Sequence, residues 1–237
     1  VGDDEYANGL YRSQAAASEL SGNLEDYRDT SRRINSYRQF YHGLEVCDFG
    51  CGEGSFVQQI KTSTSRLTAI ELQKSSLENL TNEGIECYND IEVVPDNTFD
   101  TIFSFHVLEH LSNPIEILEI MKRKLKPGGT IILEVPSAGD FLLMDPLGLE
   151  CFKQFTLWSQ HLILHNRLSI ERFVKEVELT LLCIEGVQRY PLSNHLNWLR
   201  NNKPGGHKSF LSVLDTPLLN EAYEASLCKI DATDTLT

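Results

Sequence analysis

The chain has 237 residues, of which 41% are hydrophobic and 23% are charged, and these proportions are those of an ordinary globular protein. Its 34 acidic residues outnumber its 21 lysines and arginines and give a formal net charge of -13. This balance argues against a nucleic-acid partner, which usually requires a basic surface.

The cysteines and apolar runs indicate the compartment. The six cysteines form no C-x-x-C pair and no Cys/His spacing typical of zinc, so we expect neither a disulfide framework nor a metal. This pattern favours a cytoplasmic protein. Cys47 and Cys183 lie in apolar runs and are predicted to be buried. Charged residues and prolines interrupt the most apolar region, 130–149, so we predict no signal peptide and no membrane contact.

The first segment is predicted to be helical. Residues 5–41 have apolar and tyrosine positions at helical spacing, with a break at residues 21–23, and we assign 1–43 to an N-terminal helical cap. Five of the eight tyrosines fall here. They serve either as packing rings in a helical layer or as a lid over a ligand pocket, with Tyr11 or Arg12 reaching the ligand.

Strands and helices alternate between residues 44 and 135. The pattern predicts strands at 44–49, 66–71, 85–88, 99–104 and 129–135, and helices at 54–62, 73–83 and 112–125. Such alternation implies right-handed crossovers and a parallel sheet with helices on both faces. Ligands of such sheets bind beyond the carboxyl ends of the strands.

The last third of the chain is less regular. We predict a helix at 168–177, with Ser169 as its N-cap, and a strand at 179–190. We therefore assign 44–190 to one core, 191–232 to a long insertion or lid before the last strand, and 233–237 to the start of that strand. Within the lid, His195, Trp198 and His207 are candidates for recognising a polar, ring-shaped ligand.

A glycine-rich turn follows the first predicted strand. The pattern Asp48-x-Gly50-x-Gly52-x-Gly54 leads from that strand into a helix, and glycines at such a turn let the backbone approach a nucleoside cofactor. Glu71 ends the next strand, where its carboxylate is placed to accept the two ribose hydroxyls. The alternative for Glu71 is a solvated acid at a strand end.

The glycine spacing separates two kinds of cofactor. A dinucleotide fingerprint needs Gly or Ala at position 55, where Ser55 stands, and Glu53 would bring negative charge to a pyrophosphate. S-adenosylmethionine carries no phosphate, and its amino group and sulfonium are positive. A loop framed by Asp48 and Glu53 therefore favours S-adenosylmethionine over NAD(P).

Three segments, 46–54, 99–111 and 125–134, resemble in order three motifs of the class I S-adenosylmethionine-dependent methyltransferases of the small-molecule branch. The resemblance covers 44–135 and implies an α/β fold with a Rossmann-like, seven-stranded sheet and S-adenosyl-L-methionine as cofactor. It implies that the methionine moiety lies against Asp48, Gly50, Cys51, Gly52 and Gly54. It places the ribose and adenine at Glu71, Leu72, Asp90 and Ile91, and it closes the site with Ser104, Phe105 and His106. The Asn/Asp-Pro-Pro-Tyr tetrapeptide of adenine and glutamine methyltransferases is missing from the sequence.

Three histidines are candidate catalytic residues, because a hydroxyl acceptor needs a base within hydrogen-bond reach. His106 and His110 share one face with Glu109 if a helical turn starts at residue 106. His106 is a cofactor contact or a base, and His110 is a base or a brace for the loop. His161 is a further base candidate, with a backbone hydrogen bond at a helix entry as its alternative. Some quinone-related O-methyltransferases similarly use two acids and a histidine in this segment for magnesium, but His106 replaces the first acid, so we expect no metal.

The acceptor is the least constrained part of the prediction. Segments 160–166 and 189–199 resemble methyltransferases of bacterial surface-polysaccharide and sugar modification, which implies a sugar or nucleotide-linked sugar as acceptor. Alternatives are a quinone or secondary-metabolite O- or C-methyltransferase, an NAD(P)-dependent oxidoreductase, and a catalytically silent cofactor-binding regulator. We expect methyl transfer to a hydroxyl or an amine of a small polar acceptor, no nucleic-acid partner, and a monomer or homodimer.

Overall fold

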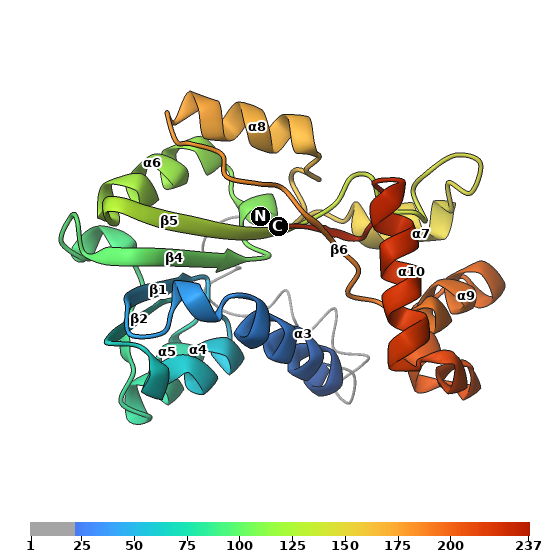
Figure 1. Cartoon of the computed structure of the whole chain (residues 1–237), viewed down its shortest axis with the longest axis horizontal. Helices are drawn as coiled ribbons and strands as arrows, with labels where there is room; N and C mark the ends of the chain where they lie inside the picture. The colour runs from blue at the N-terminus through green and yellow to red at the C-terminus, as the bar shows by residue number, and fades with distance from the viewer. Residues whose placement is uncertain (1–21) are drawn as a thin grey trace. The chain divides into compact units, whose positions relative to one another are not determined.

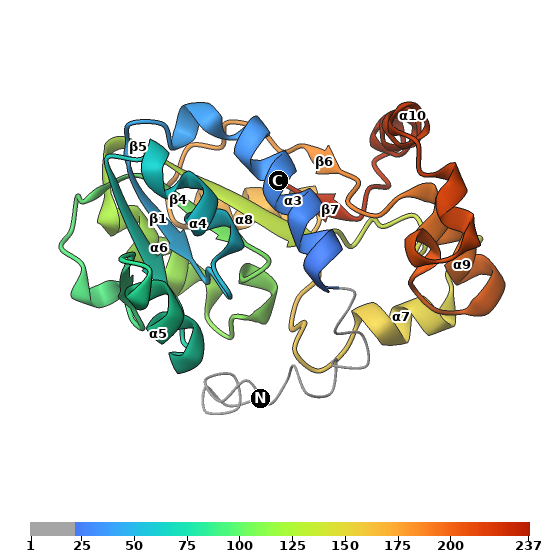
Figure 2. The same ribbon diagram turned by 90° about the horizontal axis from the view of Figure 1, so that it is seen from below.

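The structure is a computed structural model that describes residues 22–237 (Figures 1 and 2). Predictions for the first 21 residues, including those for Tyr11 and Arg12, lie outside the described residues. The strands are β1 (Glu45–Phe49), β2 (Arg66–Ile70), β3 (Glu86–Tyr88), β4 (Phe99–Phe105), β5 (Leu125–Pro136), β6 (Gly186–Val187) and β7 (Thr235–Leu236). The α-helices are α3 (Gly22–Ser36), α4 (Ser55–Ile60), α5 (Lys74–Asn82), α6 (Pro114–Lys124), α7 (Glu150–Thr156), α8 (Arg167–Glu176), α9 (Leu192–Asn201) and α10 (Pro217–Lys229). Short 3-10 turns are η2 (Arg38–Phe40), η3 (Lys61–Ser63), η4 (Ile91–Val93), η5 (Leu108–His110), η6 (Gly206–Lys208) and η7 (Phe210–Leu214).

The strands form a seven-stranded sheet in the order β3-β2-β1-β4-β5-β7-β6. Strand β1 pairs in parallel with β2 and with β4, and β2 pairs in parallel with β3. The strand order reverses between β1 and β4, which is where open α/β sheets bind their ligands. The last strand, β7, pairs antiparallel with both β5 and β6. This topology confirms the predicted Rossmann-like fold.

The chain divides into two compact units. Of the described residues, the first contains 22–107 and 113–133, and the second contains 108–112 and 134–237. In the first unit, each strand and helix predicted between 44 and 125 forms near its predicted bounds. Strand β5 starts at Leu125 rather than at residue 129, and it includes Gly128, whose φ is 81°.

An aromatic core holds the first unit together. The ring of Phe56 on α4 lies 5.2 Å from Phe103 and 5.2 Å from Phe105 of β4, and Tyr37 stacks on Phe105 at 6.0 Å. Tyr37 and Tyr41 are both buried, so these two tyrosines are packing rings. Helices α3 and α4 lie side by side (Figure 2). The core therefore fixes the end of β4, where several candidate site residues begin.

Three predictions for the second unit are wrong. Only Gly186 and Val187 form a strand within 179–190, since β7 offers a partner only there, and Cys183 is exposed rather than buried. Helix α8 is capped by Asn166, whose side chain accepts from Ser169, so Ser169 closes a capping box instead of being the N-cap. The long segment after residue 190 folds into α9, η6, η7 and α10. Within residues 22–237, no helix has the length and apolar character that a membrane crossing needs.

Candidate functional site

The glycine turn at the end of β1 is built on backbone angles that only glycine adopts easily. Gly50, Gly52 and Gly54 have φ of 76°, 59° and 85°. A Cβ atom on Gly50 would lie 2.4 Å from Val107, and one on Gly54 would lie 2.3 Å from Leu80. The pattern predicted from the sequence is therefore required by local geometry, before any ligand is considered.

Glu71 ties this turn to the loop after β2. One carboxylate oxygen accepts from the backbone N–H of Gly52 at 2.7 Å. The other accepts from the N–H groups of Leu72 at 2.7 Å and Gln73 at 2.9 Å. Glu71 is only 5% exposed, so it is not a solvated acid at a strand end. Because a carboxylate has about four acceptor sites, these three bonds orient it and leave capacity for one further donor.

The acids at this edge match a ligand that carries positive charge. Asp48 on β1 is 2% exposed and lies next to the glycine turn.

Burial, and then the charge of Asp48, raises the pKa of the Cys51 thiol far above its ordinary value, so the thiol stays protonated. Cys51 therefore lines the turn as a small apolar group and is no nucleophile.

The remaining predicted cofactor residues follow β2, β3 and β4. Leu72 is 43% exposed and Ile91 is buried, while the Asp90 side chain caps η4 by accepting from the Glu92 N–H at 2.9 Å. On β4, Ser104 is buried and Phe105 belongs to the aromatic core. Since β1, β2, β3 and β4 are parallel neighbours, their carboxyl ends bring all these residues to one edge of the first unit.

His106 follows β4 with φ of 56°, a left-handed conformation that is costly for residues other than glycine. No helical turn starts there, because η5 begins at Leu108. The predicted shared face of His106, Glu109 and His110 is therefore wrong. His106 belongs to the first unit, whereas Glu109, His110 and His161 belong to the second.

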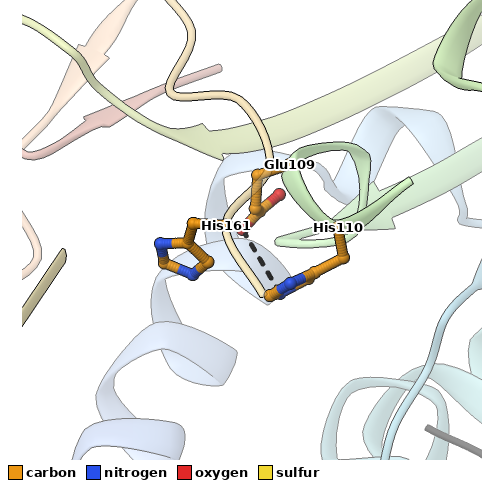
Figure 3. A group of neighbouring side chains, drawn as sticks. All are labelled: Glu109, His110 and His161. Carbon is orange, nitrogen blue, oxygen red and sulfur yellow. Dashed lines mark ion pairs between the residues drawn. The ribbon is translucent and has the colours of Figure 1, made fainter. Parts of the chain in front are cut away.

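Glu109, His110 and His161 form a compact group within the second unit (Figure 3). One nitrogen from each ring and one carboxylate oxygen lie within 4.8 Å of one another. The Nε2 atom of His110 is 3.9 Å from Glu109 Oε1, and the two ring centroids are 5.0 Å apart. The two segments are joined by the backbone, because the N–H of Leu162 donates to the carbonyl of Glu109 at 2.8 Å.

Both histidine rings are oriented by backbone carbonyl groups. The Nδ1 of His110 lies 2.8 Å from the Gln160 carbonyl oxygen, and the Nδ1 of His161 lies 2.8 Å from that of Thr156. A carbonyl only accepts, so Nδ1 is the donor in each ring, and a neutral ring keeps a lone pair on Nε2. Thr156 ends α7, so the bond from His161 also satisfies a free carbonyl at a helix C-terminus.

Burial controls the charge of this group. It lowers the pKa of both His110 and His161, so both rings are neutral at neutral pH. Burial raises the pKa of Glu109 to about 8, and Arg189 opposes that shift through its charge. Arg189 is separated from Glu109 by many residues, and no pattern in the sequence connects the two. The arrangement offers neutral bases beside a buried carboxyl group.

Three lid candidates have structural roles. His195, Trp198 and His207 are 2%, 2% and 7% exposed. Trp198 packs with Phe152 in a small apolar core, and His195 Nδ1 lies 2.6 Å from the Tyr223 hydroxyl. These rings belong to the interior of the second unit and present no open recognition surface.

Comparison with known proteins gives a consistent result. A family profile described as "Methyltransferase domain" matches residues 12–184. The chain is 29% identical over 129 residues to a malonyl-[acyl-carrier protein] O-methyltransferase of Erwinia pyrifoliae, covering 52% of this chain and 49% of that protein. It is 24% identical over 186 residues to a ubiquinone biosynthesis O-methyltransferase of Alkalilimnicola ehrlichii, covering 68% and 72%.

A tRNA U34 carboxymethyltransferase of Pseudoalteromonas atlantica is 28% identical over 113 residues, covering 43% of this chain and 35% of that protein. The chain thus spans about half or less of the length of two of these relatives. Among solved structures, a SAM-dependent methyltransferase from Archaeoglobus fulgidus matches with a TM-score of 0.58 at 15% identity, covering 88% of this chain and 91% of that one, and so shares the fold.

The profile covers well over half of the chain, and its match agrees with the glycine turn, the strand order and the acids at the sheet edge. The chain belongs to the methyltransferase domain family, and its sheet has the fold of S-adenosylmethionine-dependent methyltransferases of known structure.

Proposed function

We propose that this enzyme methylates a hydroxyl group of a small polar acceptor, and that His110 or His161 removes the proton of that hydroxyl. The observation that carries the proposal is the pair of neutral rings whose Nδ1 atoms are held by carbonyl groups. Each ring thereby keeps Nε2 as a proton acceptor. An acceptor that is already a free amine would need no such base.

The chemistry requires few groups. S-adenosylmethionine, when bound, supplies an electrophilic methyl carbon on a sulfonium. With the cofactor bound, the acceptor oxygen would take the methyl group as the C–S bond breaks, and Nε2 of His110 or His161 would take up the hydroxyl proton. General-base assistance is typically worth 10²–10⁴-fold in rate. Orientation of the two reactants contributes about 7–11 kcal/mol more in well-aligned systems.

For the cofactor we keep the residue roles predicted from the sequence as part of this proposal. Glu71 binds the ribose, the glycine turn and Asp48 hold the methionine moiety, and Ile91 packs on the adenine. The support is that Glu71 is already oriented by three backbone N–H groups and that Asp48 is buried at the same edge. Residues 1–43 as a cap and 191–232 as a lid belong to the same proposal.

A sugar or nucleotide-linked sugar remains our leading acceptor, on the resemblance of segments 160–166 and 189–199. The second candidate is a quinone-type phenol, favoured by the similarity to a ubiquinone biosynthesis O-methyltransferase. A cytoplasmic location and a monomer or homodimer are further parts of the proposal. The similarity to a tRNA-modifying enzyme makes tRNA a necessary arm of the test, although the charge of -13 argues against it.

The test has a binding step and a transfer step. Calorimetric titration with S-adenosylhomocysteine and with NADH should show binding of the first alone. Methyl-labelled cofactor is then incubated, in EDTA, with nucleotide sugars, catechols, primary amines and tRNA. Label in a sugar or a catechol supports hydroxyl methylation and separates the two candidates. Label only in amines or tRNA overturns the proposal, and cofactor binding without transfer to any arm indicates a regulator.

A further inference from the structure

We propose that Glu109, His110 and His161 form a binding site for a divalent transition-metal cation of the zinc type. The sequence alone predicts no metal, because His106 replaces the first acid of the pattern of two acids and a histidine in quinone-related O-methyltransferases. The tertiary structure supplies a third side chain, His161, from a segment about 50 residues away. The inference concerns cation binding and does not depend on which acceptor the enzyme uses.

The spacing of the donor atoms fits a chelating group. They lie within 4.8 Å of one another, and the His110 Nε2 to Glu109 Oε1 separation is 3.9 Å. Ligand atoms at about 2.1 Å from a tetrahedral zinc are about 3.4 Å apart. Figure 3 shows the three side chains grouped together, and binding of an ion requires side-chain rotations that shorten the donor separations to about 3.4 Å.

The surroundings orient the ligands as they do in metal sites. A metal-binding histidine commonly donates its other N–H to a backbone carbonyl, which fixes the tautomer and the ring plane. Both His110 and His161 make that bond, each at 2.8 Å. The Glu109 side chain is 1% exposed, so its carboxylate is held in place.

Gln160, whose backbone carbonyl orients His110, also has a buried side chain. Gln160 is 8% exposed, and its side-chain oxygen has no hydrogen-bond partner among the described residues. A buried acceptor of this kind costs about 1–3 kcal/mol unless a donor or cation satisfies it. It lies in the segment whose backbone carbonyl already holds His110.

The donor set selects the class of ion. Two imidazole nitrogens and one carboxylate suit zinc, iron, nickel or cobalt, whereas magnesium and calcium prefer sites made of oxygen alone. Three protein ligands leave a tetrahedral ion one open position, as in catalytic zinc sites. A bound cation would occupy the lone pairs that the proposed base uses, so one molecule does not perform both roles at once.

Cobalt(II) binding tests the site without any measurement of turnover. Protein treated with EDTA and then freed of it is titrated with Co²⁺, whose visible absorption reports ligation by protein nitrogen and oxygen, and with Zn²⁺ as competitor. We expect one Co²⁺ ion per chain. In His161→Ala and in Glu109→Gln, the affinity for Co²⁺ should fall by about tenfold to hundredfold or more. His42→Ala is the matched control, because His42 Nδ1 also lies near a carbonyl oxygen, that of Ser63, but His42 is exposed.

No Co²⁺ band in the wild-type protein overturns the site, and so does a band that survives unchanged in both folded variants. Far-UV circular dichroism establishes that the variants are folded, and the wild-type titration decides the question even if one is not. Activity in EDTA separates this inference from the proposed function. If the protein binds no Co²⁺ but its turnover in EDTA depends on His110 or His161, the proposed base stands and the metal site is rejected. If the protein binds Co²⁺ but shows no turnover in EDTA, the metal site stands and the proposed base is rejected.

Discussion

The glycine turn in the first unit and the Glu109–His110–His161 group in the second are built in different ways. The turn depends on residues that adjoin in sequence, and its geometry follows from three positive φ angles. The histidine group joins η5 to the segment after α7 through backbone hydrogen bonds. The glycine turn, where we propose that the cofactor binds, thus follows from local backbone geometry. The histidine group, where we propose that the base lies, depends instead on contacts between distant segments.

The largest expected effect breaks the histidine group. Either His110→Ala or His161→Ala, whichever removes the base, should lower turnover in EDTA by 10²–10⁴-fold at saturating cofactor. The reason is that no side chain then accepts the proton of the acceptor hydroxyl. Affinity for S-adenosylhomocysteine should stay the same, because neither His110 nor His161 is among the proposed cofactor residues. Steady-state kinetics measure the first and calorimetry the second. If neither variant loses at least about tenfold relative to His42→Ala, the group is not the base.

The next effect tests whether the turn requires glycine at position 54. Gly54→Ala places a methyl group against Leu80 and keeps φ at 85°, so we expect a loss of about 2–4 kcal/mol in the free energy of unfolding. Gly43→Ala is the matched control, because Gly43 has φ of 72° but nothing within 4 Å of its Cβ position. Urea denaturation should give a loss of about 1–2 kcal/mol for the control. Equal losses in the two variants would show that close packing at the turn is unimportant.

A third prediction compares a buried acid of the second unit, Asp140, with a partly exposed acid of the first unit, Glu86. Burial, and then the charge of Asp234, raises the pKa of Asp140 to about 7. The folded state therefore holds a proton that the unfolded state releases near pH 4, and stability falls as pH rises from about 4 to about 7. Asp140→Asn should reduce the fall between pH 5 and pH 7 by about 2 kcal/mol, measured by urea unfolding at each pH.

In the first unit, Glu86 is the control for that measurement. A hydrogen bond from Arg66 lowers the pKa of Glu86 to about 2, so its contribution is complete above pH 5 and is lost only as pH falls toward 2. Glu86→Gln should leave the slope between pH 5 and pH 7 unchanged. A change of slope in Glu86→Gln matching that in Asp140→Asn would contradict this assignment.

The smallest effect concerns Glu71. Glu71→Ala removes the acceptor of three backbone N–H groups and the proposed ribose contact, so the Kd for S-adenosylhomocysteine should rise by about tenfold or more, which is about 1.4 kcal/mol. Glu78→Ala, an exposed acid on α5, should not change the Kd. Calorimetry gives both values, and an unchanged affinity in Glu71→Ala would remove Glu71 from the ribose site.

Several residues show where sequence reasoning stops. Cys47 is buried as predicted because it lies on a strand paired on both sides, whereas Cys183 is exposed because the apolar run around it finds a partner strand only at residues 186 and 187. His195, Trp198 and His207 have the composition of a recognition surface, yet they pack inside the second unit. Residue type and spacing do not report which of two possible environments the rest of the chain provides.

The sequence by itself determined the fold and the cofactor class, and it predicts the edge of the sheet where the cofactor binds. This was possible because positive φ angles, strand-end acids and alternating strands and helices are local constraints that particular residue types satisfy. Tertiary structure alone brought His161 to Glu109 and His110, started η5 at Leu108 rather than at His106, and raised the pKa of Glu109. Those outcomes depend on burial and on hydrogen bonds between segments about 50 residues apart, and no periodicity along the chain encodes them.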